Sequence, residues 1–102
     1  MEPHKRYYAV IFTSSRTEGD NGYADMANIM ENLARQQEGF LDFEAARDGL
    51  GIAISYWESL EAIANWKANI DHQVAQDKGK DAWYSSYKVR ICSVEREYEF
   101  TR

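Results

Sequence analysis

The sequence predicts an α+β domain in the order β-α-β-β-α-β, with both helices on one face of a four-stranded antiparallel sheet. Three observations lead to this class. Segments with strand-like and helical patterns follow one another in that order along the chain. The chain has 102 residues, which is the length of one domain, so residues 1–102 are treated as a single unit. A chain this short does not build two sheets, and two helices cover only one sheet face.

The first half of the chain predicts a strand, a polar loop and a helix. Residues 7–13 are aromatic and β-branched on both alternating faces, so we expect a central strand that is covered on both sides. Residues 14–22 form a polar loop. Apolar residues then recur at helical spacing from about residue 23 to residue 38. Gly39 stands where a glycine commonly ends a helix.

The middle of the chain predicts a hairpin followed by the second helix. Residues 40–48 and 52–57 are strand-like, and the Asp-Gly-Leu-Gly segment at 48–51 favours the positive φ angles of a tight turn. Ser59 is the predicted N-cap of a helix with an apolar stripe. We expect this helix to continue to about residue 78.

Residues 82–100 predict a long final strand. Tyr87, Val89 and Ile91 share one face of it. Beyond Ile91 the apolar residues change to the opposite face, which predicts a bulge or a strand that leaves its sheet face. Residues 95–100 alternate glutamate with larger side chains, so the tail is expected to be an ordered strand with a solvated edge.

The sheet face that the helices leave uncovered is also predicted to be apolar. A second copy of the same sheet is the simplest cover, so we expect a two-fold homodimer formed through this sheet face and the C-terminal strand. The residues assigned to this face are Tyr7 or Tyr8, Val10, Phe12, Phe43, Ile54 and Val94.

Composition narrows the class of protein. Seventeen acidic residues against twelve basic ones give a net charge of −5, the wrong sign for a protein that wraps nucleic acid. No apolar run approaches the roughly 18–20 residues of a membrane helix. The single Cys92 excludes an internal disulfide and favours a reducing compartment, so we expect a cytoplasmic location. His and Cys are not spaced as metal ligands, and we expect no metal. The aromatic fraction of 14% is high for one small core.

Several motifs carry a resemblance to a known family. They are Gly39-Phe40, the run at 56–62, Trp66, the group of His72, Ala75, Gln76 and Gly79, Trp83-Tyr84 with Tyr87, and Val94-Glu95-Arg96 with Tyr98. On these residues the chain resembles the antibiotic biosynthesis monooxygenase family of dimeric α+β barrels, and its last third is similar to an uncharacterised bacterial branch. The resemblance implies a ferredoxin-like protomer in a homodimer, with a cavity between the helices and the sheet.

The resemblance also implies a chemistry. Members with known activity are similar in using neither flavin nor metal, so no cofactor is expected, and their deprotonated substrate, often a polyphenol, reacts with oxygen directly. This chemistry needs an aromatic cavity, a base, and donors where an oxyanion develops. His72 is the candidate base, because histidine titrates near neutral pH, and Arg47 is the candidate that stabilises the anion, with Arg90 as another donor. The candidate substrate-binding residues are Trp66, Tyr56, Trp83, Tyr84 and Tyr87.

Each candidate also has a plainer structural interpretation. His72 has no orienting partner in the sequence, which favours a residue that caps a helical turn or bonds a backbone carbonyl over a base. Trp66 belongs to the core or to a pocket wall. Trp83, Tyr84 and Tyr87 form either the rim of a cavity or the aromatic anchor of the dimer.

The sequence favours a cofactor-independent oxygenase that acts on a small aromatic or quinone-like molecule. One alternative is a non-catalytic domain of the same fold that binds a small molecule or serves a stress response. A haem-degrading monooxygenase is the less favoured alternative. Haem-degrading relatives look like this chain at Trp66 but use an Asn in the first strand and a later His, whereas here that strand has no Asn and Gln76 stands at the later position.

Overall fold

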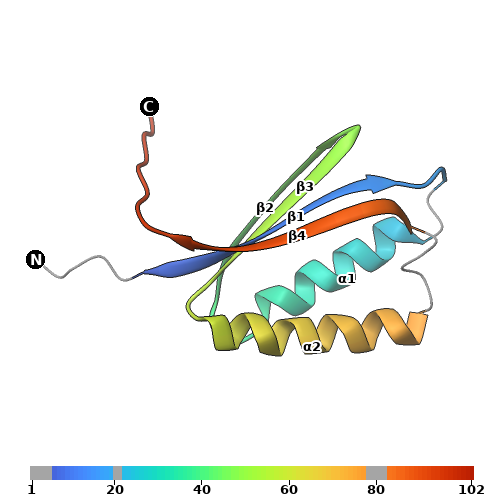
Figure 1. The fold of residues 1–102 in the computed structure, drawn as a ribbon, viewed down its shortest axis with the longest axis horizontal. Coiled ribbons are helices and arrows are strands. Elements are labelled where there is room, and N and C mark those ends of the chain that lie inside the picture. The colour runs from blue at the N-terminus through green and yellow to red at the C-terminus, as the bar shows by residue number, and fades with distance from the viewer. Residues whose placement is uncertain (1–5, 20–21, 78–82) are drawn as a thin grey trace, which may run out of the picture.

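The computed structural model describes residues 6–19, 22–77 and 83–102, and the side chains of residues 71–77 lie outside that description. Its elements are β1 (Tyr7–Arg16), α1 (Tyr23–Arg35), β2 (Phe40–Asp48), β3 (Leu50–Trp57), α2 (Leu60–Asp77) and β4 (Tyr84–Val94). The strands form one antiparallel sheet in the order β2-β3-β1-β4. Both helices lie on one side of this sheet (Figure 1). The predicted α+β class and ferredoxin-like βαββαβ order are confirmed.

β1 is a central strand, as its two apolar faces predicted, because it pairs with β3 on one side and β4 on the other. Tyr8 and Val10 pack against the core beneath the helices. Ala9, on the alternate face, is also buried. The strand continues to Arg16, three residues beyond the predicted end, because its polar last residues still find backbone partners in the two neighbouring strands.

The core lies at the end of the sheet where β3 leads into α2. Trp57, the last residue of β3, is fully buried and stacks on Trp66 of α2 with ring centroids 6.0 Å apart. The Trp57 indole N–H donates to Ser55 Oγ at 2.8 Å, so its polar group is satisfied inside the core. Small and branched side chains fill the space around the two rings: Ala34, Ala62 and Ile63.

The helix ends differ in part from the expectation. Ser59 caps α2 as predicted, because its Oγ accepts the Ala62 N–H at 3.0 Å. α1 ends at Arg35, before the predicted Glu38, and Gly39 is therefore not its cap. Gly39 instead has a φ of 88° and turns the chain into β2 directly beside α2. A Cβ at Gly39 would stand only 2.6 Å from that of Ala62, so glycine is required by both conformation and space.

β4 is regular, without the bulge that was one of the two predicted explanations for its change of apolar face. Its pairing with β1 is continuous from Ser86 to Val94, and the one register shift lies at the other end, between Ser15 and Arg16 of β1. The ladder keeps its register through Ile91, so the apolar residues before and after that point lie on opposite faces of one regular strand.

The predicted strand over the last residues is wrong. Val94 pairs with Tyr7, the first residue of β1, and the ladder ends there. Residues 95–102 have no regular secondary structure, and Tyr98 and Phe100 are 84% and 71% exposed. The alternating pattern could not form a strand without a neighbour to pair with. Figure 1 shows this C-terminal segment extending away from the helices and sheet.

We call the sheet face away from the helices the open face. The alternation of β1, β3 and β4 places on it Tyr7, Ala9, Ile11, Ile52, Ile54, Tyr56, Cys92 and Val94. Ile54 and Val94 were predicted correctly, but Val10, Phe12 and Phe43 turn to the helix side. Val10 of β1 and Phe43 of β2 both pair with the buried Ser55, which lies on the same face of β3 as the buried Trp57. Phe12 lies two residues after Val10 and therefore on the same face, because strand side chains alternate with a period of two.

Charged side chains border the open face along both edges of the sheet. Asp42 and Glu44 of β2 pair with open-face residues of β3, and Lys88 and Arg90 of β4 pair with β1. One edge is therefore acidic and the other basic. Within the described residues, no helix is long and apolar enough to cross a membrane.

Candidate functional site

A cleft of about 310 Å³ opens on the helix side of the sheet, between the β2–β3 hairpin and the start of α1. The alternation described above turns most of its strand residues to the helix side, whereas Ala46 and its partner Ile52 alternate toward the open face. Phe12 and Ser14 come from β1, and Tyr23 is the first residue of α1. The hairpin supplies the rest of the lining: Ala45, Ala46, Arg47, Gly51, Ile52 and Ala53.

Arg47 crosses the hairpin and reaches the central strand. Its Nη2 donates to Ser14 Oγ at 2.7 Å, and its Nη1 donates to the Ser14 carbonyl at 3.4 Å and the Gly49 carbonyl at 3.5 Å. The path runs directly over Gly51, the residue paired with Arg47 across the hairpin. A Cβ at Gly51 would collide with the guanidinium group. The missing side chain at Gly51 therefore creates the position that Arg47 occupies.

Ser14 is the buried end of this contact. It is only 2% exposed, so its hydroxyl needs a partner inside the protein, and Arg47 provides one. Because the hydroxyl oxygen accepts from Arg47, its own proton is left to donate. The arrangement places a guanidinium and a hydroxyl donor side by side in the cleft wall.

The charge of the cleft is positive, although the chain carries a net charge of −5. Arg47 is the single charged residue of the described lining. Arg16 packs on Tyr23 of the lining, with its Cζ 3.7 Å from the centre of the ring. Arg16 is held by the carbonyls of Trp83 and Gly19 at 3.2 Å and 3.1 Å. Two cations near an aromatic wall favour an anionic or electron-rich ligand.

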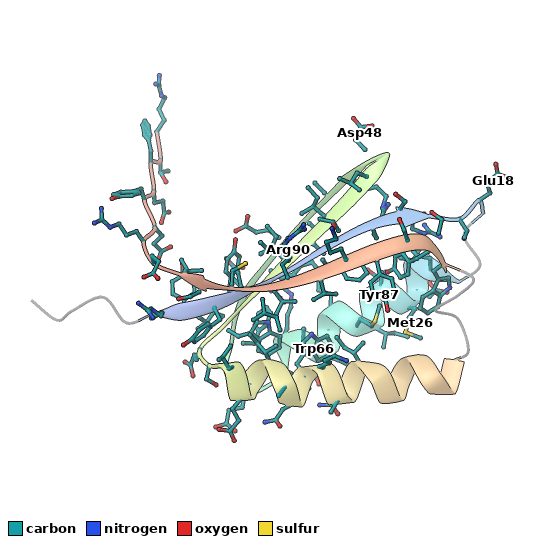
Figure 2. All side chains as sticks on the ribbon, in the orientation of Figure 1. Glu18, Met26, Asp48, Trp66, Tyr87 and Arg90 are labelled. Atoms are coloured by element: carbon teal, nitrogen blue, oxygen red, sulfur yellow. The ribbon has the colours of Figure 1, made fainter. Side chains whose placement is uncertain are left out.

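Aromatic side chains continue the wall from β1 to β4. Phe12 stacks on Tyr87 at 5.3 Å and meets Tyr84 edge-on at the same distance. Tyr23 meets Tyr84 at 5.8 Å and the buried Trp83 at 6.3 Å. Figure 2 shows Tyr87 on the helix side of β4. These rings form one connected cluster beside the arginine.

Tyr84 is a neutral donor in this cluster. Burial raises the pKa of its hydroxyl well above the ordinary value of 10.0, and the hydrogen-bonded Tyr23 raises the pKa further, while Arg47 and Arg16 act in the opposite direction. Tyr84 therefore keeps its proton at neutral pH. Its hydroxyl can donate to an oxyanion but cannot serve as a phenolate base.

The structure brings some of the predicted site residues together and separates others. Arg47 lines the cleft, and Trp83, Tyr84 and Tyr87 belong to the aromatic cluster beside it. The remaining aromatic candidates lie elsewhere. Trp66 is in the core stack with Trp57. Tyr56 is on the open face, where its ring meets that of Tyr7 at 6.1 Å.

Of the two other polar candidates, the structure describes the side chain of Arg90 alone, and Arg90 does not line the cleft. Arg90 points to the open side of β4 (Figure 2). His72 belongs to α2, but its side chain lies outside the described residues. Among the described residues, no three His, Cys, Asp or Glu side chains cluster as metal ligands.

Sequence reasoning missed Ser14, Tyr23 and Gly51 as site residues. Two signals were available. Alternation along β1 places Ser14 on the same face as Phe12, and the Asp48-Gly49 turn sets Arg47 opposite Gly51. An arginine opposite a glycine in a hairpin indicates a side chain that crosses the neighbouring strand.

The fold and cleft define a ferredoxin-like α+β protein with an aromatic, arginine-bearing cleft on its helix side. The same fold is found in SnoaB from Streptomyces nogalater, a cofactor-independent oxygenase solved as a point mutant. The TM-score is 0.72 at 11% sequence identity, over 92% of this chain and 97% of that one. At this identity the likeness shows the fold alone.

Sequence comparison gives the family. Residues 8–78 match the family model described as antibiotic biosynthesis monooxygenase, and the chain belongs to this family. It is 47% identical to the uncharacterized protein YqjZ of Bacillus subtilis over 100 residues, covering 96% of this chain and 88% of the relative. It is 25% identical over 92 residues to the jasmonate monooxygenase ABM of Pyricularia oryzae, covering 85% of this chain and 43% of that longer protein. The family and distant relatives thus include proteins named as monooxygenases.

Proposed function

We propose that this protein is a cofactor-independent monooxygenase that acts on a small aromatic or quinone-like molecule in the cleft beside Arg47. The observation that carries the proposal is the combination of family membership with an aromatic wall and a guanidinium donor in one cleft. An aromatic wall orients a planar ring, and the donors stabilise negative charge as the ring is deprotonated.

In the proposed reaction, a ring methylene of the substrate becomes a carbonyl. A base removes one C–H proton, and the resulting carbanion reacts with molecular oxygen to form a peroxide. Loss of the second C–H proton with cleavage of the O–O bond leaves one oxygen atom in the carbonyl and releases the other as water. The substrate supplies all four electrons, so the balance needs no external reductant.

The roles follow from the chemistry of each group. Arg47 and the Tyr84 hydroxyl are the proposed donors to the developing oxyanion. His72 on α2 is the proposed base, because imidazole accepts a proton near neutral pH. Tyr87 and Trp83 are proposed to line the ring-binding wall. Trp66 and Tyr56 are proposed only as supports for the fold and the open face.

Oxygen uptake tests this function. The purified protein is incubated with a panel of anthrones, naphthols and quinols, and products are analysed by mass spectrometry for the gain of one oxygen and the loss of two hydrogens. We expect uptake that falls at least about tenfold in Arg47→Met, which loses charge-assisted hydrogen bonds, and in His72→Ala. Tyr56→Phe, on the open face, is the control and should retain activity. If a ligand binds without being converted and no compound of the panel causes oxygen uptake, the protein is a binding domain and the monooxygenase proposal is contradicted.

We also propose that a second copy of the chain covers the open face. The face is largely apolar, with an acidic edge at Asp42 and Glu44 and a basic edge at Lys88 and Arg90. A two-fold axis that lies in the plane of contact and runs parallel to the strands would place each acidic edge against the partner's basic edge.

Light scattering tests the assembly. We expect twice the chain mass for the wild type and one chain mass for Ile54→Asp, which introduces a charge in the centre of the open face. Ile29→Asp, at a 43% exposed position of α1, is the matched control and should stay dimeric. A wild-type mass of one chain would contradict the proposal.

A further inference from the structure

The unused hydrogen-bond donors of Arg47 lie together on one edge of its guanidinium group. A guanidinium has five N–H donors. Nη1 uses both of its hydrogens on the Ser14 and Gly49 carbonyls, and Nη2 uses one on Ser14 Oγ. The Nε–H and the second Nη2–H have no acceptor among the described residues. These two neighbouring donors match the two oxygens of one carboxylate.

The surroundings favour an anion at this edge. Within the described part of the chain, the two ion pairs join Arg6 to Glu95 and Arg35 to Glu31, and neither involves Arg47. The described lining of the cleft holds no carboxylate. Asp48, the next residue in the sequence, stands at the hairpin tip and points away from the helices (Figure 2). Among the described residues, Arg47 is thus held by neutral oxygens, which fix its position without compensating its charge.

The aromatic wall indicates the second chemical group of the ligand, in addition to a carboxylate. Tyr23 and Phe12 line the same cleft as Arg47, and the Arg47 Cζ lies 6.0 Å from the centre of the Tyr23 ring. Arg16, on the Tyr23 ring at 3.7 Å, packs against this wall. A planar ring attached directly to the carboxylate can pack on this wall while its oxygens reach Arg47.

We propose that the cleft selects small aromatic carboxylates, with the carboxylate paired to the Nε and Nη2 edge of Arg47 and the ring packed against Tyr23 and Phe12. The proposal deepens the function given above, because it rests on the same cleft, but it does not require oxygen chemistry. A phosphate ester is disfavoured, because the two unused donors on the Nε and Nη2 edge of Arg47 match the two oxygens of a carboxylate and leave a third phosphate oxygen without a donor from that edge.

Binding measurements with three probes of the same ring test the selection. The probes are 1-naphthoate, its neutral isostere 1-naphthamide, and 1-naphthyl phosphate, titrated by calorimetry under nitrogen. We expect 1-naphthoate to bind about ten- to a hundredfold more tightly than the amide, the ratio that charge-assisted hydrogen bonds supply. The phosphate should bind more weakly than the carboxylate. Equal binding of acid and amide, or tighter binding of the phosphate, would overturn the proposal.

Variants assign the selection to Arg47. Arg47→Met should abolish the difference between acid and amide, and Arg47→Lys should lose most of it, because an ammonium cannot form the paired contact. Arg90→Met removes an arginine from the open side of β4 (Figure 2) and should leave the difference intact. Circular dichroism confirms that each variant is folded. Selection that persists in Arg47→Met would refute the proposal.

The outcome separates this inference from the proposed enzyme. Selective binding of 1-naphthoate without oxygen uptake from any substrate supports the carboxylate site and contradicts the proposed monooxygenase activity. Oxygen uptake with neutral substrates that 1-naphthoate does not inhibit supports the proposed monooxygenase activity and contradicts the carboxylate site.

Discussion

Replacing Gly51 by alanine is expected to change stability in opposite directions, depending on whether Arg47 is present. The alanine Cβ would collide with the Arg47 guanidinium as it now lies. The end of an arginine side chain moves more easily than two paired strands do, so we expect Arg47 to swing out. It would then lose its 2.7 Å hydrogen bond to Ser14 Oγ.

The magnitude is a balance of two effects. Gly51 does not have a positive φ, so alanine should itself stabilise the strand by about 0.5–1 kcal/mol. In the wild type this gain is outweighed by the charge-assisted bond to Ser14, worth about 1.5–3 kcal/mol. The net expectation is a loss of about 0.5–2.5 kcal/mol in the free energy of unfolding. In an Arg47→Ala background Ser14 has already lost its partner, so Gly51→Ala should add about 0.5–1 kcal/mol.

The assay is urea unfolding of the four proteins of this double-mutant cycle, followed by the fluorescence of the buried tryptophans. The coupling free energy should exceed about 1 kcal/mol, with the sign of the Gly51→Ala effect reversed between backgrounds. Responses equal within about 0.5 kcal/mol would refute the reasoning. They would mean that Arg47 does not occupy the space over Gly51 in solution.

Three further predictions concern the core, the turn and pH. Gly39→Ala should lower the free energy of unfolding by about 1–3 kcal/mol, since it strains a positive φ and meets Ala62, and Ala62→Gly should recover part of the loss in the same urea titration. Trp57→Ala should cost about 3–5 kcal/mol, against less than about 0.5 kcal/mol for Tyr98→Ala on the exposed tail; comparable losses would contradict the assigned core. The pKa of Tyr84 is raised in the native state above its ordinary value of 10.0. Above pH 10 the unfolded chain therefore loses a proton that the native state keeps, so the free energy of unfolding should fall as the pH rises past 10. Tyr84→Phe should flatten that fall in urea midpoints measured across the alkaline range.

Residues with a single strong pattern were predicted well from the sequence. The two apolar faces of β1 predicted its central place, and the hairpin around Gly49 and the Ser59 cap follow from local chemistry that needs no distant partner. The order of elements followed from these local signals. The βαββαβ fold was therefore within reach of the sequence.

The errors arose at residues whose structure depends on pairing with a strand that is distant in the sequence. The tail at 95–100 has a strand pattern but no strand to pair with, because the ladder ends at Val94 opposite Tyr7. Phe12 was predicted on the open face because both faces of β1 are apolar, and only the register with Trp57 decides between them.

The candidate site was predicted in part for the same reason. Arg47 and Tyr84 are candidates because of their chemistry, and the fold places Arg47 in the cleft and Tyr84 in the aromatic cluster beside it. Tyr56 is a candidate on the same grounds, but it faces the other side of the sheet. Its strand parity relative to Trp57 contains this information, and applying that parity first would have separated the two groups.

Core and cleft occupy different stretches of the same strands and helix. On β1 the core uses Tyr8 and Val10 while the cleft uses Phe12 and Ser14, and among the described residues none is shared between the two sets. Apart from the contact among Ser14, Arg47 and Gly51, substitutions at the cleft end are therefore not constrained by the packing around Trp57 and Trp66. Such a division lets recognition diverge over evolutionary time while the architecture persists, and it accounts physically for a fold that is retained at 11% identity. The hairpin that carries Arg47 is the segment in which relatives with other ligands should differ most.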